Sequence, residues 1–276
     1  MRRLLHLPPC TATSGLYLVL GLLPIDAVLA RNTLTLFANI IRYPGTVEYQ
    51  VIVRQLSVKD PSSHSWTTIV KSLLALYDLP SSYQLLHNPP PKLQWKKTLR
   101  RNIIARSIEL LKRDASQKFS LRYLNLRACR SGHLHHVYGS ANDSPRDILR
   151  ACTKVRFLLG QYRLQADIAK QSGGSPLCIV CGCGPEDLYH LIFICDKLQD
   201  LYTRFLERTY ALIQSPDIWK IILQSRENLI QLIMDCSEPT LCIPENQIHE
   251  LETLTRHYLY AVHCRRATYY QVKNSP

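Results

Sequence analysis

The chain has 276 residues, 46% of them apolar, which is enough for one large or two modest domains with a real core and excludes a disordered tail. Its 34 lysines and arginines outnumber its 21 aspartates and glutamates, and the formal net charge of +13 is unusual for a soluble enzyme of this size and indicates a polyanionic partner. Between Lys96 and Lys170, seventeen basic residues stand against five acidic ones, a net charge of +12. We therefore expect a surface that binds a polyanion to lie in this segment.

The first thirty residues imitate a signal peptide, with a basic start at residues 1–3, an apolar run at residues 16–23 and small residues at 28–30. Prolines interrupt this stretch, Asp26 stands inside the apolar region, and a helical apolar period continues across the apparent cleavage site. No apolar stretch approaches the ~18 residues of a membrane span. We therefore expect an intracellular protein that is neither secreted nor bound to a membrane. In such a protein clustered cysteines bind metal more often than they form disulfides.

Apolar residues recur at helical spacing along most of the chain, so the sequence predicts a mostly α fold. The predicted helices cover residues 27–42, 66–77, 99–111, 145–169, 197–213 and 250–269. Residues 80–95 (PSSYQLLHNPPPKLQW) are predicted to be a turn-rich linker, with three prolines fixing an extended boundary. These patterns divide the chain into a helical connecting region (1–90), a basic helical segment (91–172), a knuckle (173–200) and a C-terminal helical segment (201–276).

The helix at residues 145–169 has the clearest start signal. Ser144 is a predicted N-cap, Pro145 stands at the first helical position, and the charge of Asp147 favours the positive helix end. We expect one face of this helix to be buried and the basic residues of the opposite face to be exposed. The predicted buried residues are Ile148, Ala151, Val155, Leu158, Leu159 and Tyr162, and the predicted exposed cations are Arg146, Arg150 and Lys154.

Basic residues on such a face commonly contact nothing but water. Here the acidic residues that usually alternate with them are largely missing, which favours phosphate binding instead. The candidate nucleic-acid-binding residues are Lys96, Lys97, Arg100, Arg101, Arg146, Arg150, Lys154, Arg156 and Arg163. Aromatic residues in the same segment, among them Phe119 and Tyr123, could stack on bases, although most aromatic residues at helical spacing belong to the core.

The stretch CIVCGCGPEDLYHLIFIC carries the sharpest motif in the chain. Cys178 and Cys181 form a Cys-x-x-Cys turn, and His190 and Cys195 follow at a spacing that closes a tetrahedron of three thiolates and one imidazole around a single Zn²⁺. Because the protein would fill all four positions, the zinc would be structural, with no place for an activated water. A redox Cys-x-x-Cys or unrelated buried thiols are the alternatives, and Cys183 is a spare thiol that could compete as a ligand.

We assign no metal site to two other groups of residues that could bind metal, the remaining cysteines and a cluster of histidines. The cysteines outside the motif show no comparable spacing and are expected in the core. The histidines in SGHLHHVYG, which are His133, His135 and His136, lack nearby acids or thiols. We therefore expect a polar loop there rather than a second metal site.

Residues 147–198 (DILRACTKVRFLLGQYRLQADIAKQSGGSPLCIVCGCGPEDLYHLIFICDKL) resemble the carboxy-terminal region of non-long-terminal-repeat (LINE-type) retrotransposon polyproteins, downstream of the reverse transcriptase. In that family a basic helical segment precedes a Cys/Cys/His/Cys zinc-binding motif. Residues 15–42 and the segments LIQLIMDCSEP and LTRHYLYAVHCRRA are similar to further parts of the family. The resemblance implies that Cys178, Cys181, His190 and Cys195 bind one zinc per chain. It also implies RNA or DNA and the polymerase portion of the same element as partners, and a nuclear location for a functional protein.

The chain departs from this family in its catalytic residues. Paired aspartates hold Mg²⁺ in the family's reverse transcriptases, and no Asp-Asp occurs anywhere in this sequence. A phosphate-cradling Gly-x-x-x-x-Gly-Lys loop, an identifiable nucleophile with its base and the family's endonuclease domain are missing too. We therefore expect no enzymatic activity and interpret the chain as a fragment or degenerate copy that begins at an internal methionine.

The sequence thus predicts a mostly α, helical accessory module with a small zinc-stapled knuckle. Its predicted role is to bind nucleic acid, mainly through phosphates, while another part of the element performs the chemistry. The alternative is a structural or protein-interaction tail in which the zinc only stabilises the fold. Both interpretations place the zinc in the knuckle, and they differ in what the basic helices contact.

Overall fold

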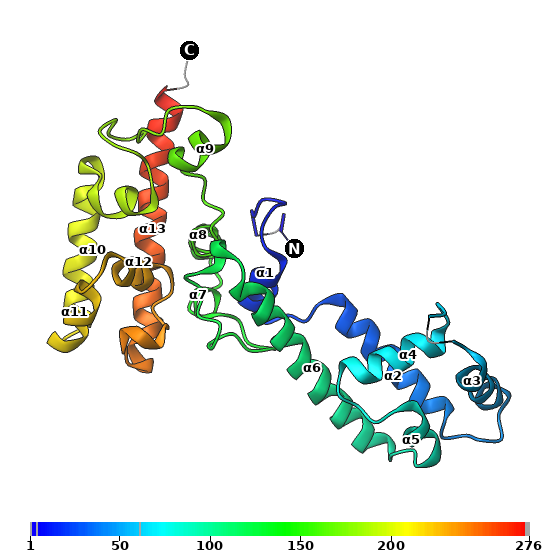
Figure 1. Ribbon diagram of the computed structural model, residues 1–276. Helices are drawn as coiled ribbons and strands as arrows, with labels where there is room; N and C mark the ends of the chain where they lie inside the picture. The colour runs from blue at the N-terminus through cyan, green and yellow to red at the C-terminus, as the bar shows by residue number, and fades with distance from the viewer. Residues whose placement is uncertain (1, 4, 61, 274–276) are drawn as a thin grey trace. The chain divides into compact units, whose positions relative to one another are not determined.

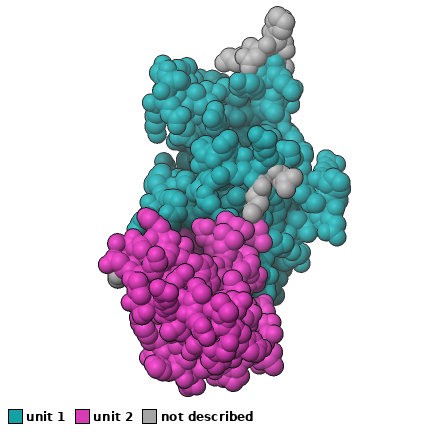
Figure 2. All heavy atoms as spheres, turned by 90° about the vertical axis from the view of Figure 1, so that its right-hand side faces the viewer, with its two compact units in different colours: residues 1–21, 114–276 teal, residues 22–113 magenta. Residues whose placement is uncertain are grey.

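The computed structural model describes residues 2, 3, 5–60 and 62–273. Every regular element in these residues is helical, and the only strand-like feature there is an isolated bridge between Leu177 and Pro185. The prediction of a mostly α protein is confirmed. The chain divides into two compact units, unit 1 (residues 1–21 and 114–276) and unit 2 (residues 22–113), which Figure 2 shows in different colours. These boundaries fall at other positions than those of the four predicted segments.

Unit 2 is a group of helices around one apolar core. Its helices are α2 (Ile25–Ile40), α3 (Val47–Val58), α4 (Trp66–Leu76), α5 (Ser82–His87) and most of α6 (Lys92–Ser116) (Figure 1). Hydroxyl groups satisfy the first N–H groups of three of them, because Thr46, Ser65 and Ser81 cap α3, α4 and α5. Phe37 of α2 and Trp95 of α6 are buried in the core that these helices enclose.

The long helix α13 is the central element of unit 1. The elements of this unit are α1 (Thr13–Leu20), η1 (Phe119–Leu121), α7 (His136–Gly139), α8 (Pro145–Leu158), α9 (Gln165–Ser172), η2 (His190–Ile194), η3 (Asp196–Leu198), α10 (Gln199–Leu212), α11 (Pro216–Leu223), α12 (Arg226–Met234), η4 (Pro239–Leu241) and α13 (Glu245–Lys273). α13 packs against both α8 and α10 (Figure 1). Trp219, Leu232 and Leu251 belong to a core that joins α11, α12 and the start of α13.

The predicted helix at residues 145–169 begins as expected, but its predicted length is wrong. The Asp147 N–H donates to the Ser144 Oγ at 3.2 Å, which confirms the predicted cap. α8 ends at Leu158, and Gly160 follows with a φ of 63°, in the left-handed region that favours glycine. A Cβ at Gly160 would lie 2.9 Å from the Cβ of Ser120. The left-handed glycine ends α8, Ser120 leaves no room for a side chain at this position, and α9 begins as a separate helix at Gln165.

The prediction of a linker at residues 80–95 is also wrong. The Gln84 N–H donates to the Ser81 Oγ, and the Ser81 N–H donates to the side-chain oxygen of Gln84. This reciprocal cap starts α5 inside the predicted linker. α6 begins at Lys92, directly after the last proline, and runs to Ser116, so the basic helix is longer at both ends than predicted.

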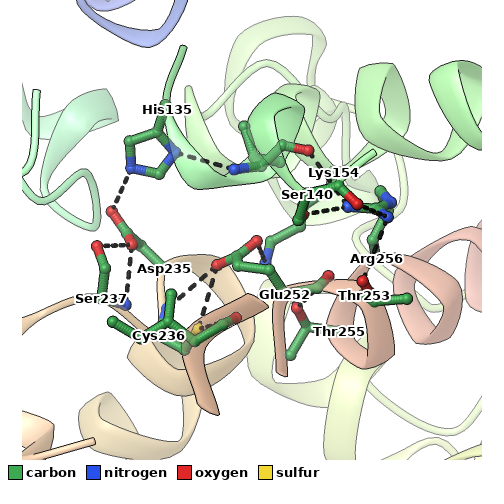
Figure 3. Close-up of polar contacts among 12 residues, drawn as sticks. His135, Ser140, Lys154, Asp235, Cys236, Ser237, Glu252, Thr253, Thr255 and Arg256 are labelled. Carbon is green, nitrogen blue, oxygen red and sulfur yellow. Dashed lines mark hydrogen bonds and ion pairs between the residues drawn. The ribbon is translucent and has the colours of Figure 1, made fainter. Parts of the chain in front are cut away.

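Two buried ion pairs join α8 to α13, and Figure 3 shows the pair of Lys154 and Glu252. The Lys154 Nζ of α8 lies 2.5 Å from the Glu252 Oε2 of α13 and 2.6 Å from the Thr255 Oγ1. Both charged side chains are fully buried. Arg256, one helical turn further along α13, donates to the Asp147 Oδ2 at 2.9 Å. Because both pairs link the same two helices, they fix how these helices pack.

A third buried pair joins the start of α7 to the end of α12. The His135 Nε2 lies 3.0 Å from the Asp235 Oδ2, and both side chains are fully buried. Asp235 also accepts from the Asn125 N–H at 2.7 Å and from the Ser237 hydroxyl at 2.6 Å. Burial alone would raise the pKa of Asp235, but His135, Ser237 and the Asn125 N–H outweigh burial and lower it. Asp235 is therefore a carboxylate that the interior holds in its charged form.

Substitution of Lys154 tests the buried pairs. Lys154→Met leaves the Glu252 carboxylate buried without its partner, so we expect the free energy of unfolding to fall by about 3–5 kcal/mol. The double variant Lys154→Met/Glu252→Gln removes both charges and is expected to recover most of this loss. The control Arg146→Met changes an exposed residue of the same helix and should shift stability by no more than about 0.5 kcal/mol. Urea denaturation, monitored by hydrogen exchange of the α13 amides, measures the free energy of unfolding of all three variants. Equal losses of stability in Lys154→Met and Arg146→Met would contradict the pairing of Lys154 with Glu252.

The pair of His135 and Asp235 predicts a pH dependence of stability. Burial alone would lower the pKa of His135, but the Asp235 carboxylate outweighs burial and the pKa is raised. The protonated imidazole therefore stabilises the fold below the unfolded-state value of about 6.5, and this contribution is lost as the pH rises through the raised folded-state value. We expect the stability difference between the parent chain and His135→Gln to shrink in urea denaturation as the pH rises from about 6.5 into the alkaline range. A constant difference would mean that His135 does not titrate in this range.

Candidate metal centre

Three cysteines and one histidine of the knuckle lie together in unit 1. The Cys178 Sγ lies 4.0 Å from the Cys195 Sγ, and the Cys181 Sγ lies 3.2 Å from the His190 Nε2. All four ligand atoms lie within 4.8 Å of one another. Ligand atoms of a tetrahedral metal with bonds of ~2.0–2.3 Å are about 3.3–3.8 Å apart, so small side-chain shifts bring these four onto one ion. The predicted ligands therefore form a cluster that could hold a metal ion.

The first two ligands lie on a tight turn that requires glycine. Gly182 has a φ of 74°, and its N–H donates to the Cys178 carbonyl at 2.8 Å. The Cys178 N–H donates in turn to the Gly184 carbonyl at 2.7 Å. Burial raises the pKa of the Cys178 thiol, while hydrogen bonds from the backbone of Cys181 and Val180 act in the opposite direction. These backbone donors are placed to stabilise a metal-bound thiolate.

The other two ligands lie at the two ends of a π-helical turn. In η2 the Cys195 N–H donates to the His190 carbonyl at 2.9 Å, five residues back. A π turn brings residues five apart to the same side, whereas an α-helix does this for residues three or four apart. The Asp187 Oδ1 accepts from the His190 N–H at 2.7 Å, and the Tyr258 hydroxyl of α13 donates to the Ile192 carbonyl. Sequence periodicity gave no sign of this turn, since it is a single turn without a repeating pattern.

A buried carboxylate that sequence reasoning missed lies beside the cluster. Glu186 is fully buried, and its Oε1 lies 3.9 Å from the Cys178 Sγ. Its oxygens accept from the Arg266 Nε and Nη2 of α13, each at 2.8 Å, and from the Gln165 N–H at 2.9 Å. Arg266 thereby compensates the charge of Glu186 and ties the knuckle to α13. A pairing across 80 positions leaves no local pattern from which it could have been found.

Cys183 does not belong to the cluster. Its side chain is exposed, and its thiol lies 3.3 Å from the Cys181 carbonyl. Its backbone N–H donates to the Cys181 Sγ at 3.4 Å. Cys183 therefore supports a ligand through its backbone, and its thiol points to a carbonyl instead of the cluster.

The predicted nucleic-acid-binding residues fall in both units and differ in exposure. Six of the nine are exposed, namely Lys96, Lys97, Arg100, Arg101, Arg146 and Arg163. Arg150 is partly buried and donates to the His257 Nε2 at 2.9 Å. Arg156 donates through its Nε to the His6 carbonyl at 2.8 Å. The ninth residue, Lys154, is fully buried.

The prediction that Lys154 faces solvent is wrong, whereas five of the six residues predicted to be buried on the opposite face are buried, namely Ala151, Val155, Leu158, Leu159 and Tyr162. Lys154 pairs with Glu252 in the interior and cannot reach a phosphate from there (Figure 3). Ile148, predicted to be buried, is 46% exposed. The later turns of α8 are enclosed on nearly all sides, as the buried Cys152 and Phe157 show. Helical periodicity predicts that a lysine on the polar face of a helix is exposed to solvent. Lys154 is instead buried, and its charge is paired with Glu252 of α13, a helix far along the chain.

The structure also places Phe119, His135 and the six cysteines outside the knuckle. Phe119 is 78% exposed, and the Arg122 guanidinium lies 3.9 Å from the centre of its ring. His135 is buried in its ion pair, so the prediction of a polar loop is wrong for this histidine. Of the six cysteines outside the knuckle, three are buried as predicted, and the exposed ones are Cys10, Cys242 and Cys264. None of these cysteines joins a metal-binding group among the described residues.

No known protein family, no curated protein and no solved structure matches the chain. Within the part of the chain that the structure describes, no single helix is both long and apolar enough to cross a membrane, and α1 and α2 pass that test of length and composition only when taken together. The geometry of the cluster and the exposure of the basic residues are therefore the basis for assigning a function.

Single-cysteine variants test the cluster. The ligands must lose their protons and are scattered in the unfolded chain, so metal binding and folding of the knuckle should be one event. We expect the full chain to bind one Co²⁺ with the visible absorption of a tetrahedral thiolate site. Cys178→Ser and Cys195→Ser should lose this absorption, and the matched control Cys183→Ser should keep it. An equal loss in Cys183→Ser, by absorption and elemental analysis, would contradict the assigned ligands.

Proposed function

We propose that Cys178, Cys181, His190 and Cys195 hold one structural Zn²⁺. Three thiolates and one imidazole are among the donor sets that zinc prefers in closed tetrahedral sites. The cluster would supply all four ligands from the protein, so the ion would stabilise the knuckle and would not activate a water molecule. The donor set and the short distances among its atoms support this assignment.

We further propose that the chain is a non-catalytic accessory tail of a LINE-type retrotransposon reverse transcriptase that binds the phosphates of RNA or DNA. The observation that carries the binding function is a row of five exposed cations on α6, here called the α6 cation row. Its members are Lys92, Lys96, Lys97, Arg100 and Arg101. Among the described residues, none of the five forms an ion pair. The order of a basic segment followed by the Cys/Cys/His/Cys motif supports the assignment to the retroelement family.

The spacing of the α6 cation row favours a polyanionic partner. Lys92, Lys96 and Arg100 stand four residues apart and lie on one side of the helix, with Lys97 and Arg101 beside them. Like charges at this spacing destabilise a helix, so a row without acidic neighbours lowers stability unless a partner neutralises it. Unit 2 also carries 13 basic residues against 5 acidic ones, which is more than half of the net charge of the chain.

A protein-interaction tail is the second candidate, and exposed apolar side chains of α3 favour it. Val47 and Val58 are each 72% exposed, and Val51 is 47% exposed. Val51 follows Val47 by one helical turn and precedes Val58 by two, so the three form one stripe. Contiguous exposed apolar surface often marks a protein contact. In this candidate the polymerase portion of the same element is the partner, and the zinc only stabilises the fold.

Salt-dependent binding of the full chain to a fluorescent single-stranded RNA tests the nucleic-acid function. Each phosphate contact contributes roughly −0.7 to the slope of log affinity against log salt on a single strand. We expect the variant Lys96→Gln/Lys97→Gln/Arg100→Gln/Arg101→Gln to flatten this slope by about two to three units, with little dependence on base sequence. Its fold should persist, because all four side chains are exposed.

A matched pair of arginines on α10 serves as the control. Arg204 and Arg208 are exposed and lie outside the basic segment, on a helix that also carries Asp200 and Glu207. Arg204→Gln/Arg208→Gln should therefore leave the slope nearly unchanged. A parent chain with no affinity tighter than ~100 µM at physiological salt, the weak end of non-specific binding, would reject the nucleic-acid function in favour of the protein-interaction tail.

A further inference from the structure

A cationic pocket of about 330 Å³ lies in unit 1, where the N-terminal segment, the end of α8 and α13 meet. Its lining includes three arginines, two histidines and a tyrosine, and it is here called the arginine pocket. These residues are His6, Arg156, Tyr162, Arg163, His263 and Arg266. We infer that the arginine pocket binds a phosphate group of a nucleic-acid strand. The inference rests on the proposed nucleic-acid function and adds a site outside the α6 cation row.

The charges around the arginine pocket favour an anion. None of its lining residues is acidic. Arg266 is already neutralised from behind by the buried Glu186, whose oxygens accept from it and from the Gln165 N–H. Arg156 and Arg163 form no ion pair with a carboxylate of any described residue. Two uncompensated guanidinium groups thus line the pocket, and their fork of donors matches the oxygens of a phosphate.

Contacts behind the arginine pocket hold its groups in place before a ligand arrives. Arg156 donates through its Nε to the His6 carbonyl at 2.8 Å, which leaves its terminal Nη1 and Nη2 for a ligand. The Tyr162 hydroxyl lies 3.0 Å from the His263 Nδ1. Burial, followed by the charges of Arg156 and Arg266, lowers the pKa of His263. The pocket is therefore electropositive even with a neutral imidazole, and because its donors are already held in place, less side-chain entropy of the protein is lost on binding.

Size and surroundings favour a polynucleotide over a lipid headgroup. The volume of the pocket lies at the lower end of the roughly 300–1,000 Å³ typical of ligand sites, which suits one phosphate with part of its sugar. Arg163 is exposed and can contact the next phosphate of a strand. Membrane attachment would also need large exposed apolar side chains around the pocket. Its largely apolar lining residues are only Pro8 and the nearly buried Tyr162.

Variants of the two uncompensated arginines test the inference in the full chain. Binding of a short fluorescent oligothymidylate is measured by anisotropy at increasing salt. Arg163→Gln should flatten the slope of log affinity against log salt by about 0.7, and Arg156→Gln/Arg163→Gln by about 1.4, at roughly 0.7 per contact. Arg163→Lys keeps the charge and should restore most of the slope. The Arg163 side chain is exposed, and no hydrogen bond or ion pair joins it to a described residue, so the single variants keep the test valid even if the double variant unfolds.

The outcomes separate the arginine pocket from the proposed function. An unchanged slope in the Arg163 variants beside a flattened slope in the α6 variant would overturn the pocket and leave nucleic-acid binding intact. No binding of oligothymidylate or of the single-stranded RNA by the parent chain would overturn both. Inorganic phosphate and phosphatidylserine vesicles are the comparison probes. If Arg163→Gln weakens binding to either of these but not to oligothymidylate, the pocket takes free phosphate or lipid instead, and the inference is rejected.

Discussion

The buried ion pair of Lys154 and Glu252 constrains how α8 and α13 pack in unit 1. An unpaired ion in an apolar interior costs several kcal/mol, so the lysine of α8 must meet the glutamate of α13. One turn further along α13, Arg256 meets Asp147 under the same constraint. Compared with apolar residues of similar size, buried pairs add little stability. We expect them instead to define the register of α13, because a shift of this helix by one residue separates both pairs at once.

That register also positions the supports of the metal cluster. Downstream of Arg256, the side chain of Tyr258 binds a carbonyl of the π turn, and Arg266 holds Glu186 beside Cys178. Arg265 donates to Asp200 at the start of α10, at 2.5 Å. The knuckle is too small for a core of its own and depends on these contacts for its orientation. The geometry of the four ligands is therefore a property of unit 1 as a whole, and not of the Cys-x-x-Cys turn alone.

Features with a local cause could be predicted from the sequence, and features with a distant cause could not. The helical fold follows from apolar spacing, the start of α8 from Ser144 and Pro145, and the metal cluster from a motif of eighteen residues. The burial of Lys154 depends on a partner 98 positions away, which no helical pattern contains. The break at Gly160 was missed because apolar residues continue at helical spacing on both sides of it. Gly160 is itself a local stop signal, since its left-handed backbone ends α8, whereas the approach of Ser120, which excludes a side chain there, exists only in the folded chain.

The distinction between local and distant causes also applies to charge. The net charge of a segment indicates a phosphate-binding surface only when the cations that are already paired inside the fold are left out of the count. The net charge of +12 between Lys96 and Lys170 includes Lys154 and Arg150, which buried or partly buried partners already engage. The cations left for a ligand include the α6 cation row in unit 2 and the arginine pocket in unit 1. A row on a helix surface attracts phosphates over a distance without fixing their orientation, whereas guanidinium groups held in a pocket orient a single phosphate. If both bind one strand, most of the salt-dependent affinity should therefore come from the row, and the position of the strand along the protein from the pocket.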